Sequence, residues 1–130
     1  MINNHSKLIW SLSGSGQSTT LAASGNSGTT ALDIGESTDV WLAVYVAGTS
    51  TGTTPTLDVQ LDVRDAAGNW FPQVMKVTQL TSGPGYASTS GGLHIAGNGS
   101  MVLPRHCRVT WTVGGTSPVF PQASISLYGR

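Results

Sequence analysis

Charged side chains are scarce in this chain of 130 residues, where six basic and six acidic residues make up 9% of the total. Globular domains usually hold about 25% charged residues. A nucleic-acid-binding protein needs a basic stripe to neutralise phosphates, and a helix that lies on a membrane surface needs a face rich in Lys and Arg. The sequence therefore predicts neither nucleic acid nor a membrane as a partner.

Cysteine and long apolar runs are also lacking. Cys107 is the only cysteine, so no internal disulfide can form, and we expect synthesis in a reducing cytosol. No apolar run approaches the roughly 20 residues of a membrane span. The first six residues have neither the basic nor the apolar region of a signal peptide. The length fits one domain over residues 1–130, and its polar start leaves room for a short N-terminal arm over residues 1–6.

Small and hydroxyl-bearing residues take the place of the charges, with 17 Gly, 16 Ser and 16 Thr. The apolar segments are short and mostly alternate with polar residues, and no segment repeats with a helical period, which predicts an all-β fold. The expected strands cover residues 7–12, 17–22, 29–34, 39–47, 56–64, 70–77, 92–96, 100–103, 107–113 and 123–128. This number and spacing of strands favour a single β-sandwich of the jelly-roll kind.

Two of these strands have informative patterns. Between Leu57 and Arg64, apolar and polar residues alternate strictly, which predicts one face against the core and one face toward water. Residues 40–47 are apolar on both faces, and the second face presents Trp41, Ala43 and Tyr45. A strand of this kind is covered on both sides, either by a loop of its own chain or by another subunit. Both interpretations stay open.

Glycine and proline mark the connections. Residues 65–69 read Asp-Ala-Ala-Gly-Asn and predict a hairpin loop. Residues 82–91 are rich in Gly and Ser and predict a mobile loop. The segments 52–55 (Gly-Thr-Thr-Pro) and 115–118 (Gly-Thr-Ser-Pro) each follow one apolar segment and precede another. This weak repeat suggests two similar β-arches packed face to face.

No set of residues predicts catalysis, a metal or a cofactor. None of the three histidines has a second ligand at metal-binding spacing. Asp58 and Asp62 share one strand face about 13 Å apart, too far for one metal ion or for a glycosidase pair. We expect them to pair with Arg64 or a cross-strand residue, or to stay solvated. Asp33, Glu36 and Asp39 cluster near a turn but form no calcium-binding loop. We therefore expect that the protein is not an enzyme.

The four tryptophans suggest sugar binding as another function, because aromatic side chains can form a platform on which sugar rings stack. They are Trp10, Trp41, Trp70 and Trp111. Trp111 alternates with threonines in line with two valines, so it is expected in the core. Trp70 and Phe71 are neighbours at the start of a strand, so one of them must face outward unless another segment covers it.

Three segments resemble a pattern common in small virion proteins of tailed bacteriophages. They are Gly52-Thr53-Thr54-Pro55-Thr56-Leu57-Asp58-Val59-Gln60-Leu61, Asp65-Ala66-Ala67-Gly68-Asn69-Trp70 and Arg108-Val109-Thr110-Trp111-Thr112-Val113-Gly114-Gly115-Thr116-Ser117-Pro118. Their common features are a strand begun by Ser/Thr-Pro, a D-x-x-G-x-W hairpin and a C-terminal R-V-x-W-x-V-x-G-T-S-P block. The resemblance covers about half of the chain and leaves out residues 1–38.

The resemblance implies a head decoration, or cement, protein: a β-sandwich on the outer capsid surface that binds the major capsid protein and is often a trimer. Such a protein would be made in the cytoplasm of the bacterial host. It has no catalytic residues to transfer. The candidate contacts with the capsid or with other subunits are Trp41, Ala43, Tyr45, Ile2 and Trp10.

Two other functions remain as alternatives. One is a carbohydrate- or receptor-binding module of a tail fibre, and the other is a head–tail connector or tail protein. Binding to glycans would distinguish the first alternative, and assembly into rings would distinguish the second.

Overall fold

The computed structural model describes residues 6–92 and 104–130. Within these residues the chain forms strands and no helix, which confirms the all-β prediction. The strands are β1 (Lys7–Ser11), β2 (Thr19–Leu21), β3 (Gly25–Asn26), β4 (Leu32–Asp33), β5 (Asp39–Val46), β6 (Thr51–Arg64), β7 (Trp70–Lys76), β8 (Gly85–Gly92) and β9 (His106–Gly129). The described part contains no helix of the length and apolarity that a membrane crossing requires.

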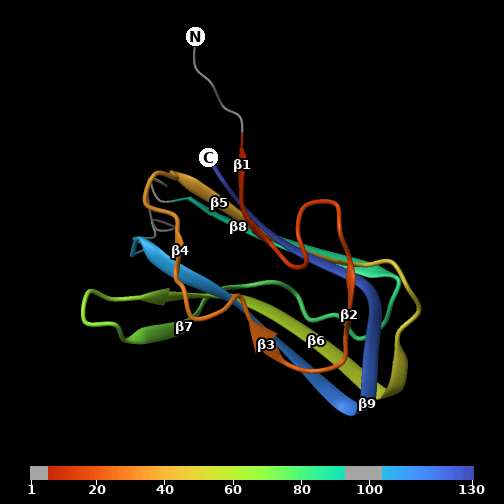
Figure 1. The fold of residues 1–130 in the computed structure, drawn as a ribbon. Coiled ribbons are helices and arrows are strands. Elements are labelled where there is room, and N and C mark those ends of the chain that lie inside the picture. The colour runs from red at the N-terminus through yellow and green to blue at the C-terminus, as the bar shows by residue number, and fades with distance from the viewer. Residues whose placement is uncertain (1–5, 93–103) are drawn as a thin grey trace.

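One long strand, β9, organises the molecule because it belongs to two layers (Figure 1). Its first half pairs with β6, and β6 pairs with β7. These three segments form the lower layer in Figure 1. Its second half pairs with β5, and β5 pairs with β8, which forms the upper layer. All of these pairings are antiparallel. The jelly-roll arrangement of the strands stays a prediction.

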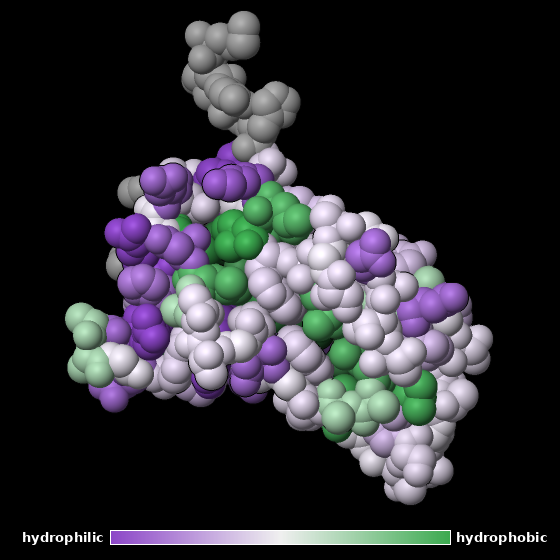
Figure 2. All heavy atoms as spheres, in the orientation of Figure 1, coloured by the Kyte–Doolittle hydropathy of each residue, from purple (hydrophilic) through white to green (hydrophobic). Residues whose placement is uncertain are grey.

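The N-terminal segment runs antiparallel along the other side of β9. The two short strands β1 and β2 pair with the second half of β9, and β3 and β4 pair with its first half. This flank faces the viewer in Figure 2 and is mostly pale, as expected for a surface rich in Ser, Thr and Gly. The strongly hydrophilic residues gather at the left end of this view.

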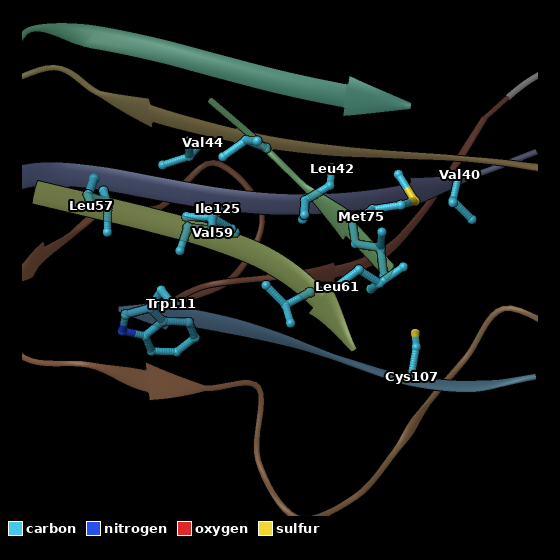
Figure 3. Close-up of a cluster of buried hydrophobic side chains, with 14 of the residues drawn as sticks. Val40, Leu42, Val44, Leu57, Val59, Leu61, Met75, Cys107, Trp111 and Ile125 are labelled. Carbon is cyan, nitrogen blue, oxygen red and sulfur yellow. The ribbon is translucent and has the colours of Figure 1, made fainter. Parts of the chain in front are cut away.

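The core lies between the two layers (Figure 3). The alternating residues of β5 and of the second half of β9 point toward the alternating residues of β6 and of the first half of β9. The side chains buried there include Val40, Leu42, Val44, Ile125 and Leu127 from the upper layer and Leu57, Val59, Leu61, Val109 and Trp111 from the lower layer. Trp111 is therefore a core residue, as predicted.

The two Gly-Thr-x-Pro segments, 52–55 and 115–118, lie opposite each other in the β6–β9 ladder. The register shifts on both sides of the pair Thr53–Thr116, so each strand carries a bulge there. Gly52 and Gly115 both have positive φ angles, of 104° and 107°. The prediction of two β-arches packed face to face is wrong, because the repeated segments are hydrogen-bonded neighbours. They mark the region where β9 leaves the lower layer and bends toward the upper one (Figure 1).

The Gly- and Ser-rich residues 82–91 do not form the expected loop, since most of them belong to β8. The whole of β8 pairs with β5, from the pair Val46–Gly85 to the pair Asp39–Gly92. Tertiary pairing with an apolar neighbour overrides the low strand propensity of Gly and Ser. The expected strand at 92–96, apart from Gly92, and the expected strand at 100–103 lie outside the described residues.

The alternation of β6 predicts that the outer face of the lower layer is exposed to water, but part of this face is buried in the structure. Asp62 is only 1% exposed, and its carboxylate accepts hydrogen bonds from Gln60 Nε2 (2.8 Å), Thr110 Oγ1 (2.8 Å), Arg108 Nε (3.0 Å) and the Gln73 backbone N–H (3.1 Å). The bulge of β7, where Gln73 has a φ of 60°, brings its backbone over β6. Burial pushes the pKa of Asp62 upward, but these hydrogen bonds outweigh burial and hold the pKa below its ordinary value.

Candidate functional site

The outer face of the upper layer is the candidate binding site. We call it the aromatic face and define it by Trp41, Ala43 and Tyr45 of β5 together with the residues beside them on β8 and β9. These three residues alternate with the buried valines and leucine of β5, so their side chains point away from the core. Trp41 is 43% exposed and Tyr45 52% exposed. Within residues 6–92 and 104–130, no loop covers these two side chains fully.

Two aromatic pairs stand at the two ends of this face. Tyr45 lies opposite Tyr86 of β8, and their rings stack with centroids 6.1 Å apart and an angle of 10° between planes. Trp41 lies opposite Tyr128 of β9, with centroids 5.7 Å apart and a tilt of 49°. Tyr86 is the most exposed large hydrophobic residue described, at 77%. Cross-strand pairing therefore holds four aromatic rings on one side of the layer.

Small residues separate the two pairs. Ala43 lies opposite Ser88 on one side and Ser126 on the other, so the middle row of the face contains no large side chain. Trp41 and Tyr45 are four residues apart, a separation of about 13 Å along a strand. The face thus carries small side chains and serine hydroxyl groups between two pairs of aromatic rings.

The structure brings together only some of the predicted contact residues. A bulge in β1 turns Trp10 toward the inside of the layer, where it is half-buried and stacks on Trp111 with centroids 6.2 Å apart. Trp10 is therefore not part of the aromatic face. Ile2 lies outside the described residues.

Sequence reasoning missed Tyr86 and Tyr128. Tyr86 lies in the segment that was expected to be a loop. Tyr128 could have been found, because it alternates with Ile125 and Leu127 along the last strand and must point to the opposite side.

Several charged groups elsewhere in the described chain pair with one another. Asp33 pairs with Arg105 (2.8 Å) and Asp39 pairs with Arg130 (2.8 Å). Asp58 pairs with Lys76 of the neighbouring strand (3.1 Å). In the described part of the chain, no three His, Cys, Asp or Glu residues lie close enough together to hold a metal ion. His5 and His94 are outside the described residues.

Cys107 is a small core residue in this fold. It is fully buried in the first half of β9, and burial raises the pKa of its thiol to about 12. The thiol therefore stays protonated near neutral pH, whereas a nucleophilic cysteine needs a thiolate.

Trp70 and Phe71 lie on opposite faces of β7, as expected for neighbours in a strand. The Arg108 guanidinium lies 4.2 Å from the centroid of the Trp70 ring, and that of Arg64 lies 5.4 Å away. Trp70 pairs with Arg64 on the outer face of the lower layer, where the two arginines cover its ring. Phe71 pairs with Val63 on the other face and is 51% exposed. It is an isolated exposed aromatic side chain on the lower layer, far in the topology from the aromatic face.

Comparison with protein-family models, curated proteins and solved structures gives no match to this chain.

Proposed function

We propose that this chain is a structural protein of a tailed-bacteriophage particle that decorates the outside of the capsid and binds the major capsid protein. The single observation that carries the proposal is the aromatic face. A cluster of exposed aromatic side chains with few charges is typical of surfaces that bind another protein. The resemblance of residues 52–118 to virion proteins supplies the class of partner.

The attachment surface is the side of the aromatic face over β5 and β8. Trp41, Tyr45 and Tyr86 are its large exposed residues. On β8, Ser88 lies opposite Ala43 and Ser90 lies opposite Trp41. Tyr and Trp are enriched among residues that dominate binding energy, because they bury a large area at low conformational cost. Many copies on a repeating lattice add up weak contacts, so each contact can be modest.

Replacing Tyr45 or Tyr86 with glutamate is expected to weaken attachment by about tenfold or more, because a charge would be buried against the partner. The measurement is cosedimentation of the purified protein with capsids of the phage that encodes it, prepared without this protein. Phe71→Glu is the matched control, since Phe71 is as exposed as Tyr45 but lies on the lower layer. Its attachment should stay within about twofold of the wild type.

Equal attachment of all three variants would contradict the proposed surface. Loss of attachment in Phe71→Glu alone would place the contact on the lower layer. Thermal unfolding of each variant shows whether a loss of attachment comes from a loss of fold. Tyr45→Glu and Tyr86→Glu change exposed side chains, so little loss of stability is expected.

A homotrimer is part of the same proposal. Native mass spectrometry of the purified chain at high micromolar concentration should show a trimer as the main species. A monomer under these conditions would contradict a trimer in solution.

A further inference from the structure

A hollow of about 360 Å³ opens beside the aromatic face, on the β9 side of β5. The loop between β1 and β2 forms one wall of the hollow, and the outward residues of β9 form the other. Its volume lies within the range of about 300–1,000 Å³ typical of small-molecule sites. Tyr45 borders both the proposed attachment surface and the hollow, whereas the rest of the hollow lies on the side of β5 away from β8.

The walls of the hollow are uncharged and mix polar groups with apolar ones, the latter from Leu8, Leu12 and Ala47. Ser11, Gln17 and Ser18 contribute from the loop side, and Ser124 and Ser126 from β9. None of the described residues that line it carries a charge. Serine hydroxyls and glutamine amides can both donate and accept hydrogen bonds. Among the side-chain hydrogen bonds between described residues, none uses the hydroxyl of these serines or the amide of Gln17.

Two aromatic rings border the hollow. Tyr45 and Tyr128 lie on neighbouring strands and belong to the two different aromatic pairs of the face. Each offers an apolar ring surface together with a phenolic hydroxyl. Gly14 and Gly16 in the opposite wall carry no side chain, which keeps the hollow open.

We propose that this hollow binds a short neutral oligosaccharide. A sugar ring has a flat apolar side made of C–H groups, which packs on an aromatic ring, and a rim of hydroxyl groups that both donate and accept hydrogen bonds. The uncharged wall disfavours anionic ligands, because a buried charge without a partner is costly. A purely apolar ligand would leave the serine hydroxyl groups of the wall unsatisfied, whereas a sugar offers partners both to them and to the apolar side chains.

The test is a titration of the full chain by ligand-detected NMR with a defined panel. The panel contains neutral trisaccharides of glucose, galactose, mannose and N-acetylglucosamine, together with sialyllactose as an anionic member. At least one neutral trisaccharide should bind with a Kd of about 1 mM or tighter. Ser126→Trp, which fills the hollow, should weaken that binding by about tenfold or more.

Ser88→Trp is the matched control. Ser88 and Ser126 flank Ala43 on its two sides, but only Ser126 lines the hollow. Ser88→Trp should bind the trisaccharide like the wild type. If Ser126→Trp fails to fold, Gln17→Ala in the exposed loop replaces it, with an expected loss of severalfold in affinity.

Three results would overturn the proposal: no neutral trisaccharide binds at about 10 mM, the folded hollow variant binds as tightly as the wild type, or only sialyllactose binds. The result is independent of capsid attachment. Tyr86 does not line the hollow, so Tyr86→Glu should keep sugar binding even where it abolishes attachment.

Discussion

Replacing Asp62 with alanine should lower the free energy of unfolding by about 2–4 kcal/mol. The carboxylate accepts four hydrogen bonds on a nearly inaccessible part of β6. Its removal leaves the hydroxyl of Thr110 and the amide of Gln60 without an acceptor, and the Arg108 guanidinium without its counter-charge. Arg108 stays partly exposed and stacked on Trp70, which keeps the loss below that of a fully buried ion pair.

Urea unfolding of the variant and of Asp39→Ala provides the comparison. Asp39 also pairs with an arginine, at 2.8 Å, but both side chains are about half exposed. Exposed pairs of this kind contribute about 0–1 kcal/mol. If Asp62→Ala unfolds at the same urea concentration as Asp39→Ala, then the carboxylate network adds little to the stability of β6 and β7.

The same network predicts a loss of stability in acid. The pKa of Asp62 is lower in the folded chain than its ordinary value of 3.8, so the folded state binds fewer protons than the unfolded state around that pH. Asp62 therefore stabilises the fold above about pH 4, and this contribution is lost as the pH falls through the lower folded pKa. In Asp62→Ala, stability should fall less steeply below pH 4 than in the wild type.

Replacing Gly115 or Gly52 with alanine should lower the free energy of unfolding by about 2–5 kcal/mol. A Cβ at Gly115 would lie 2.6 Å from the Thr54 carbonyl oxygen, and a Cβ at Gly52 would lie 2.5 Å from that of Ser117. The left-handed backbone adds about 1–2 kcal/mol for any residue with a side chain, and overlap in a packed ladder adds about 1–3 kcal/mol. The two bulges face each other in one ladder, so a shift of either strand would disrupt the hydrogen bonds between β6 and β9.

Gly68→Ala separates these two contributions. Gly68 also has a positive φ, of 91°, but a Cβ there would meet nothing within 4 Å. Chemical denaturation should show a loss of only about 1–2 kcal/mol for this control. A Gly115→Ala protein as stable as Gly68→Ala would mean that the paired bulges relax freely and do not fix the bend of β9.

The strands with apolar periodicity could be predicted from the sequence. The alternation of Val40, Leu42 and Val44 placed β5 in the core and left Trp41 and Tyr45 on the other side, as the structure has it. The hairpin at 65–69 was equally predictable. Asp65 accepts hydrogen bonds there from the backbone N–H groups of Ala67 and Asn69, and Gly68 supplies the positive φ.

The strands and contacts set by distant partners could not be predicted. Nothing local to residues 85–92 marks β8, whose Gly and Ser residues are held by pairing with β5. The glycines and the proline at 114–118 suggested that one strand ends there and another begins later, at residue 123. The facing bulge of β6 instead allows β9 to continue through them.

The burial of Asp62 and the composition of the aromatic face both depend on neighbouring strands, which local sequence patterns do not identify. Asp62 is covered because β7 bulges at Gln73, which no pattern in β6 reveals. Trp41 and Tyr45 were identified as outward residues, but their partners Tyr128 and Tyr86 depend on which strands flank β5. Residue periodicity gives the side on which a residue lies, whereas the strand order gives its neighbours.

The proposed capsid role is tested most directly by electron cryo-microscopy of intact particles of the phage source that this role implies. The account predicts copies of the chain at equivalent lattice sites on the outside of the capsid, with Tyr86 and the β8 side of the aromatic face against the major capsid protein. Particles without the chain on their capsid, or with Tyr86 directed away from the capsid protein, would contradict it.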